Sequence, residues 1–179
     1  MRARVFVLLQ YLLPRHWLTA IVWRVARIRH PATKDFLITR FARAFDVDLD
    51  EVKLEVPGDF PTFNDFFIRE LKDGAREIDD DDDAIVSPVD GTVSVAGQIR
   101  GDTIFQAKGI DYSLGDLLAT DLDEAAHYID GRFATIYLAP YNYHRVHAPL
   151  AGDLVAARYV PGDLFSVNEA TVSQLDGLF

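Results

Sequence analysis

The sequence predicts an α+β protein, in which amphipathic helices near the amino terminus precede a mostly antiparallel β domain of the sandwich or barrel type. Three observations carry this prediction. Apolar residues recur at helical spacing in the first part of the chain, and β-rich runs separated by turn signals follow from residue 85. Hydrophobic residues make up 49% of the 179 residues, which supports a sizeable core. We place the division between a helical arm, residues 1–59, and the β domain, residues 60–179.

Composition and charge narrow the possible chemistry. The chain has no cysteine, so it contains no disulfide, thiolate metal site or cysteine nucleophile. Residues 1–45 hold nine of the 18 basic residues against one acid, a net charge of +8, and the remainder carries nine basic residues against 27 acids, a net charge of −18. A basic arm on an acidic body indicates an anionic partner for the arm.

The first two helices are expected over residues 5–12 and 17–25, separated by Pro14. Their charge-free runs are too short to span a bilayer, and no cleavage site of a secretory signal follows them. An apolar stripe beside an arginine-rich face suits a helix that lies in the headgroup layer of an anionic membrane. Three interfacial aromatic residues lie among the arginines: Tyr11, Trp17 and Trp23. Residues 34–45 repeat the pattern.

The sequence allows another interpretation of the arm. The helices could pack on the β domain or on a second subunit, with their arginines in solvent. A nucleic-acid partner is not expected, because the chain has no motif that reads bases and its acidic body would repel a phosphate backbone.

Residues 60–71 predict a short helix, because Thr62 and Asp65 resemble a capping box before apolar residues at helical spacing. The acids at 79–83 predict a solvated linker, since a calcium loop needs spaced ligands and a glycine turn. A second short helix is expected over 113–119, behind a serine cap. Strands are expected at 85–86, 92–96, 103–107, 132–138 and 153–160.

The candidate chemistry lies in two histidines and one aspartate. His144 and His147 follow the strand at 132–138, and Asp90 occupies an Asp-Gly turn. A carboxylate can orient a histidine for base catalysis if the two turns converge in space. Two alternatives stay open: the histidines could tie down a loop through hydrogen bonds, or form an incomplete zinc pair. Lys108 is expected to be a solvated lysine at the end of a strand.

Several motifs together resemble those of the bacterial phosphatidylserine decarboxylase proenzyme, in the order and spacing of that family and over essentially the whole chain. The sequence QYLLP at residues 10–14 fits the same family. The motifs are FNDFFIR at 63–69, SPVDG at 87–91, QAKG at 106–109, YHRVHAP at 143–149 and YVPGDLFSVN at 159–168.

The resemblance implies a lyase of phospholipid biosynthesis that converts phosphatidylserine to phosphatidylethanolamine and carbon dioxide. Its electron sink is a pyruvoyl group, made by autocatalytic cleavage before a serine, with which the substrate amine forms a Schiff base. Asp90 and His147 match the pair that activates the cleaving serine, and His144 matches the histidine of the decarboxylation step. Three aromatic residues are also expected to line the substrate pocket: Tyr137, Tyr143 and Phe165.

One feature departs from the family pattern: no Leu-Gly-Ser-Thr or related motif occurs before Phe179. We therefore expect the chain to be the large-chain portion of the zymogen, inactive alone, with the pyruvoyl group carried by a separate C-terminal small chain. The resemblance also implies a homodimer on the cytoplasmic face of the bacterial inner membrane. The alternatives are a non-enzymatic module that binds anionic lipid and a metallohydrolase that uses His144 and His147.

Overall fold

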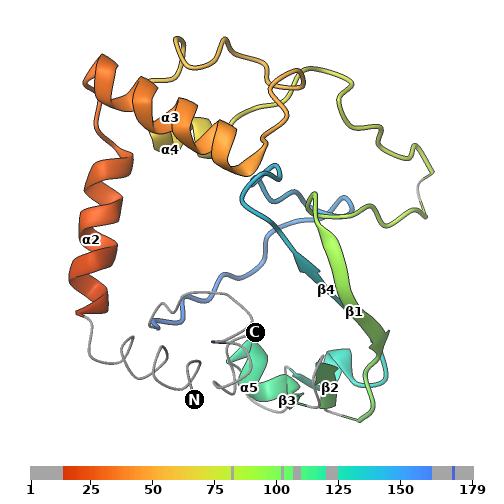
Figure 1. Cartoon of the computed structure of the whole chain (residues 1–179). Coiled ribbons are helices and arrows are strands. Elements are labelled where there is room, and N and C mark those ends of the chain that lie inside the picture. The colour runs from red at the N-terminus through yellow and green to blue at the C-terminus, as the bar shows by residue number, and fades with distance from the viewer. Residues whose placement is uncertain are drawn as a thin grey trace. The chain divides into compact units, whose positions relative to one another are not determined.

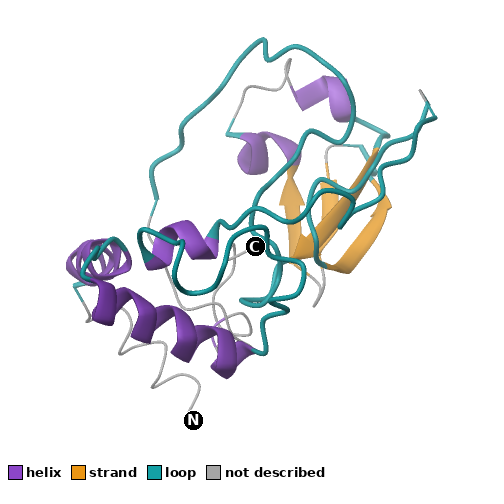
Figure 2. Cartoon of the chain, turned by 90° about the horizontal axis from the view of Figure 1, so that it is seen from above, coloured by secondary structure: helices purple, strands orange, loops and turns teal. Residues whose placement is uncertain are grey.

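The computed structural model describes residues 14–81, 83–101, 103–106, 110–119, 125–162 and 171. Its helices and short strands confirm the α+β class (Figures 1 and 2). The helix expected over 5–12 lies outside these residues, as do Lys108 and Phe165. Along the chain the elements are α2 (Arg15–Ala26), α3 (Pro31–Phe45), α4 (Phe63–Phe67), β1 (Thr92–Gln98), β2 (Thr103–Gln106), β3 (Ile110–Ser113), α5 (Leu114–Leu118), the 3-10 helix η1 (Ala126–Tyr128) and β4 (Arg132–Tyr137).

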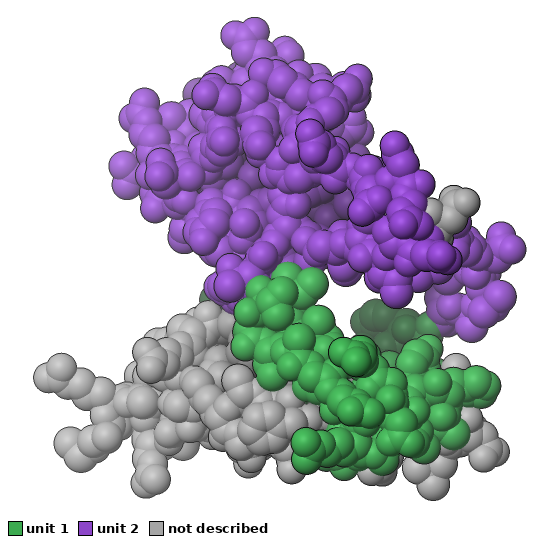
Figure 3. Space-filling view, turned by 90° about the vertical axis from the view of Figure 1, so that its right-hand side faces the viewer, with its two compact units in different colours: residues 1–20, 93–136, 158–179 green, residues 21–92, 137–157 purple. Residues whose placement is uncertain are grey.

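The chain divides into two compact units, which Figure 3 shows in different colours. The first unit comprises residues 1–20, 93–136 and 158–179, and the second comprises 21–92 and 137–157. Asp90 and both histidines of the expected site belong to the second unit. The helical arm expected to end near residue 59 stays a prediction.

Helices α3 and α4 build the core of the second unit and lie side by side in Figure 1. Helix α3 begins at Pro31, where the missing N–H needs no partner, and ends at Asp46 in the left-handed region with φ 53°. The core consists of Ile38 and Ala42 of α3 together with Val47, Val52, Phe60 and Phe66. This apolar cluster fixes the position of α4.

The start of α4 follows the expected capping chemistry. The Thr62 hydroxyl oxygen accepts the backbone N–H of Asp65 at 3.2 Å and donates its own proton to the Asp65 carboxylate at 2.7 Å. The cap sets the direction of a helix of only five residues, whose Phe66 is fully buried. Phe41 of α3 contacts the ring of Phe67 with centroids 5.8 Å apart, so α3 packs directly against α4.

Helix α2 contains no buried residue. The side chain of Trp17 is 75% exposed, and that of Trp23 is 56% exposed. The guanidinium of Arg27 lies 4.4 Å from the centroid of the Trp23 ring. No helix within the described part of the chain has the length and apolar character needed to cross a bilayer.

The first unit holds two separate two-stranded sheets. Strands β2 and β3 pair antiparallel, with Thr103 opposite Ser113. Strands β1 and β4 form the other sheet, and they run antiparallel because Ser94 bonds to Thr135 whereas Ile99 bonds to Gly131. Helix α5 follows β3 directly, and its cap is Ser113, whose side chain accepts the N–H of Asp116, as the sequence predicted. A small core unites Ile99, Leu114 and Ala125 with Phe133.

Two of the expected strands were wrong. Residues 85–86 and 153–160 have no strand structure, and Val155 is 94% exposed. A β-rich run forms a strand only where a partner takes its backbone hydrogen bonds along several residues, and residues 85–86 make a single such bond, from the Val86 N–H to the Pro149 carbonyl. For the same reason neither described sheet closes into a sandwich or a barrel. Strand β3 and helix η1 were not predicted.

Candidate active site

The segment that carries both histidines follows β4 and begins with a locally closed turn. The backbone N–H of Ala139 donates to the side-chain oxygen of Asn142 at 2.7 Å, and the Asn142 N–H donates to the Ala139 carbonyl at 2.9 Å. These reciprocal bonds form without any regular element, which fixes the chain just before His144.

Residues directly after α4 hold this histidine segment. Arg69 donates from Nη2 to the carbonyl oxygens of Tyr141 at 2.8 Å and Asn142 at 3.1 Å. In return, Arg145 donates from Nε to the carbonyl of Ile68 at 2.8 Å. The motif at 63–69 is thus the scaffold of the motif at 143–149, although about 75 residues separate them.

Arg69 is the most deeply buried charge of this site, with 3% of its surface exposed. Its Nε and Nη1 atoms have no hydrogen-bond partner among the described residues. Burial lowers the pKa of the Arg69 guanidinium, and the nearby carboxylates of Glu51, Asp48 and Asp90 oppose that shift. Its cation also lies 5.5 Å from the centroid of the Phe66 ring.

His144 has a defined tautomer. Its Nδ1 lies 2.8 Å from the carbonyl oxygen of Asn142, and a carbonyl can only accept, so Nδ1 carries the proton. The ring rests on Phe67 of α4, with centroids 4.1 Å apart and 38° between the planes. In the neutral ring Nε2 therefore keeps its lone pair, and the Nδ1 bond and the Phe67 contact fix its direction.

His147 is exposed, and its Nε2 lies 2.9 Å from the Tyr143 hydroxyl oxygen. The two rings stack with centroids 5.5 Å apart. Its backbone N–H donates to the carbonyl of Pro88 at 2.8 Å, and the N–H of Val86 donates to the carbonyl of Pro149 at 3.0 Å. The histidine segment and the Asp-Gly turn segment therefore do converge, which the sequence could not decide.

Asp90 is held by an arginine. Arg76 reaches its Oδ2 atom with Nε at 2.8 Å and Nη2 at 2.6 Å. The same guanidinium donates to both carboxylate oxygens of Glu51, at 2.8 and 2.9 Å. These bonds lower the pKa of Glu51, and together with those to Asp90 they raise the pKa of Arg76. In this structure the side chain of Asp90 binds Arg76, and that of His147 binds Tyr143.

The comparisons with known proteins bear on this arrangement. A model of phosphatidylserine decarboxylase matches residues 63–179, which contain the α4 motif, the Asp-Gly turn and both histidines. The chain belongs to the phosphatidylserine decarboxylase family. A second model, described as PSD, matches residues 5–46, the basic arm. Family membership confirms the resemblance that the motifs indicated.

Curated relatives agree along the entire chain. The chain is 49% identical over 180 residues to the phosphatidylserine decarboxylase proenzyme of Alcanivorax borkumensis, covering 100% of this chain and 62% of that protein. It is 49% identical to the proenzyme of Psychrobacter arcticus over 175 residues, 98% of this chain and 63% of that protein. For the Bordetella pertussis proenzyme the identity is 47% over 176 residues, 98% and 59% respectively. This chain thus spans about three fifths of the length of these relatives.

Of the aromatic residues expected in a substrate pocket, Tyr143 contacts His147. Tyr137 ends β4 with a 42% exposed side chain, and Phe165 lies outside the described residues. Sequence reasoning missed Phe67, Arg69 and Arg76. A signal for Arg76 was present, because it is the single basic residue between Lys72 and Arg100 in a strongly acidic stretch.

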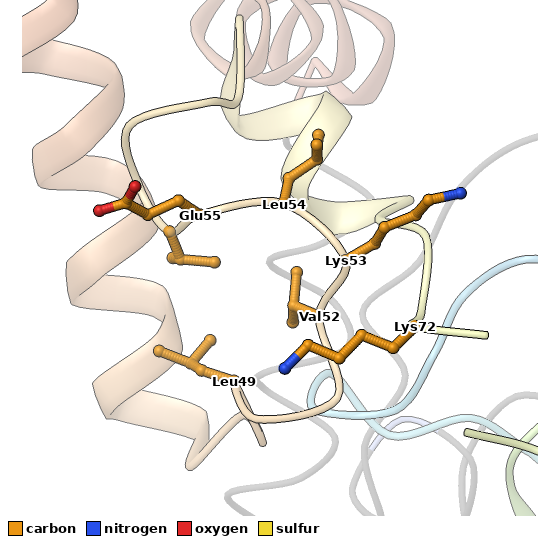
Figure 4. Close-up of a pocket in the computed structure, with 7 residues that line it drawn as sticks. Leu49, Val52, Lys53, Leu54, Glu55 and Lys72 are labelled. Atoms are coloured by element: carbon orange, nitrogen blue, oxygen red, sulfur yellow. The ribbon is translucent and has the colours of Figure 1, made fainter. Parts of the chain in front are cut away.

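Beyond the histidine segment, the described residues provide no metal cluster and one pocket without the expected chemistry. No group of three potential metal-ligand side chains occurs among them. A pocket of about 330 Å³ lies beside the loop after α3, and Figure 4 shows Leu49, Val52 and Leu54 along it. The ammonium of Lys72 at its edge donates to the Asp50 carbonyl at 2.7 Å, and no residue of the expected chemistry lines the pocket.

Proposed function

We propose that this chain is the large-chain portion of a pyruvoyl-dependent phosphatidylserine decarboxylase, and that it is inactive until a C-terminal small chain supplies the pyruvoyl group. The reaction removes carbon dioxide from phosphatidylserine and leaves phosphatidylethanolamine. The observation that carries the proposal is the convergence of the two family motifs: His147 donates its backbone N–H to Pro88, two residues before Asp90. His144 lies on the same histidine segment, ordered by Phe67.

Self-cleavage is the first task of these residues. The serine hydroxyl adds to the preceding peptide carbonyl and displaces its own amine, which gives an ester. Loss of the Cα proton then breaks the bond between Cβ and the ester oxygen, releases the large chain as a carboxylate and leaves dehydroalanine. Water replaces the nitrogen, which departs as ammonia, and a pyruvoyl ketone remains. His147 takes the hydroxyl proton, and Asp90 orients its ring.

Proton transfer during decarboxylation is the task of His144. The pyruvoyl group supplies the electrophile that accepts the electron pair left by carbon dioxide. The described residues fit such a group, because His144 presents a single nitrogen, Nε2, for proton exchange while its Nδ1 is bound to Asn142. Phe67 covers one face of the ring, which restricts water access to it.

Membrane association follows from α2. A helix without any buried residue, with Trp17 and Trp23 exposed and Arg24 in its last turn, suits the headgroup layer of an anionic bilayer. We infer a peripheral position on the cytoplasmic face of the inner membrane, whose anionic lipids attract arginine. The homodimer implied by the family resemblance belongs to the same proposal.

The β part is completed, in this proposal, by strands of the small chain. In the first unit, Val93 of β1 is 57% exposed. Apolar side chains of this kind favour a covering layer, which would complete a sandwich or barrel.

The decisive test uses the full-length proenzyme, in which this sequence continues through the serine motif. His147→Ala should block self-cleavage on a denaturing gel. His144→Ala should permit cleavage and abolish release of carbon dioxide from phosphatidylserine. Normal cleavage by the His147 variant would refute the assignment. If the chain is instead a lipid-binding module, residues 1–179 alone would bind phosphatidylserine vesicles and the full-length protein would release no carbon dioxide.

A further inference from the structure

Only one oxygen of the Asp90 carboxylate is bound by Arg76. Both contacts from Arg76 end on Oδ2, at 2.8 and 2.6 Å, and within the described residues Oδ1 has no hydrogen-bond partner. The aspartate is therefore fixed in position, with one oxygen left to accept another bond. A fixed carboxylate with a vacant acceptor is what a neighbouring imidazole N–H requires.

His147 has the complementary arrangement. Its Nε2 is 2.9 Å from the hydroxyl of Tyr143, and in the described part of the chain Nδ1 has no partner. A base that receives a hydroxyl proton at Nε2 needs its Nδ1–H held by a carboxylate. The backbone bond from His147 to Pro88 brings the two segments together at 2.8 Å.

Arg76 is itself held in place by a second carboxylate, that of Glu51. Its guanidinium binds both oxygens of Glu51, at 2.8 and 2.9 Å, and Glu51 lies 25 residues earlier in the chain. A paired fork of this type restricts the guanidinium plane far more than a single contact would, and lysine cannot reproduce it. Glu51 thereby fixes Arg76, which in turn fixes Asp90.

We propose that Arg76, anchored by Glu51, is the positioning residue of self-cleavage: it holds Asp90 by Oδ2 and leaves Oδ1 to orient the Nδ1–H of His147. The inference rests on the proposed function, because it assigns a role within that self-cleavage reaction. Arg76 touches neither the serine nor the substrate lipid and acts through Asp90. It has no part in decarboxylation, which His144 serves.

The test is a double-mutant cycle on self-cleavage in the full-length proenzyme, followed on a denaturing gel after synthesis. A charge-assisted hydrogen bond is worth roughly 1.5 to 3 kcal/mol, so Arg76→Met should slow cleavage by about tenfold or more. Arg76→Lys, which keeps the cation and loses the fork, should be slowed less. In an Asp90→Asn background, Arg76→Met should change the rate by less than about twofold, because the partner it positions is gone.

A second readout separates positioning from general support of the fold. The cleaved fraction of Arg76→Met should decarboxylate phosphatidylserine at the wild-type rate per pyruvoyl group. The matched control is Lys53→Met, which removes another cation of the same unit from an exposed ion pair, Lys53–Glu70 at 3.3 Å, and should cleave normally.

Each outcome decides between the two claims. Wild-type cleavage by Arg76→Met, with His147→Ala blocked, overturns the inference and leaves the proposed function standing. Normal cleavage by His147→Ala overturns the proposed function itself. Additive effects of Arg76→Met and Asp90→Asn would also overturn the inference. If Arg76→Met does not accumulate, Glu51→Gln replaces it in the cycle, with a smaller loss expected and the same non-additivity with Asp90→Asn.

Discussion

Replacing Arg69 by methionine should alter function far more than stability. Methionine keeps much of the length and a contact with the Phe66 ring, worth roughly 0.3 to 1.5 kcal/mol for a thioether against about 2 kcal/mol for the desolvated cation that it replaces. The bonds from Nη2 to Tyr141 and Asn142, at 2.8 and 3.1 Å, are lost. The carbonyl of Asn142 keeps its bond from His144.

The expected change in free energy of unfolding follows from opposing terms. Two charged hydrogen bonds contribute roughly 1.5 to 3 kcal/mol each, so their loss removes about 3 to 6 kcal/mol. The variant also removes two buried nitrogen atoms, Nε and Nη1, that have no partner in the described structure, and each costs about 1 to 3 kcal/mol. The terms offset each other, and we expect a net change within about 2 kcal/mol.

Two measurements on the full-length enzyme test this expectation. Urea unfolding followed by circular dichroism should give nearly unchanged stability, and decarboxylation per pyruvoyl group should fall because the His144 segment loses its tether. Lys72→Met is the control, since Lys72 is exposed and donates to one backbone carbonyl at 2.7 Å. A loss above about 4 kcal/mol would mean that Nε and Nη1 are paired in the folded enzyme. Wild-type decarboxylation would mean that Arg69 does not hold the histidine segment.

Three further predictions concern the cap of α4, the Glu51 carboxylate and α2. Thr62→Ala should lower the free energy of unfolding by about 1 kcal/mol and slow decarboxylation, because α4 carries Phe67, which contacts His144. The control, Ser113→Ala, removes the cap of α5 and should cost a similar amount of stability without slowing decarboxylation. The pKa of Glu51 is lowered in the folded state, so the Glu51 carboxylate stabilises the fold above its ordinary pKa of 4.5, and this stabilisation is lost as pH falls through the lowered pKa. In urea titrations, the free energy of unfolding of Glu51→Gln should therefore fall less steeply with acid than that of the wild type. Replacing Trp17 and Trp23 together by alanine should weaken cosedimentation with anionic vesicles by about tenfold, whereas Tyr128→Ala, at an aromatic residue about as exposed as Trp23, should not.

Local chemistry made part of the fold predictable. The caps at Thr62 and Ser113 each need only a partner three residues ahead, and both form as expected. Residues 85–86 and 153–160 have the composition of strands, but a strand also needs a neighbour, which no local pattern provides. Strand β3 was missed because its pairing with β2 depends on the hairpin and not on its own four residues.

The sequence predicted the residues to which we assign the proposed chemistry, but it did not predict the residues that hold them in place. His144, His147 and Asp90 followed from the motifs, whose family is now shown. Their neighbours depend on contacts across long stretches of chain: Arg69 reaches Tyr141 over 72 residues, and Arg76 reaches Glu51 over 25. Which side chains meet across such separations depends on how the elements pack. The spacing of residues along the sequence does not indicate these contacts.

The most direct test of the account is mass spectrometry of the small chain produced by the full-length protein, together with assay of phosphatidylethanolamine. We expect a new amino terminus that carries a pyruvoyl ketone and forms only when His147 is intact. Decarboxylation should depend on that ketone. Decarboxylation by an uncut chain, or by a small chain with an ordinary amine at its terminus, would contradict the central claim.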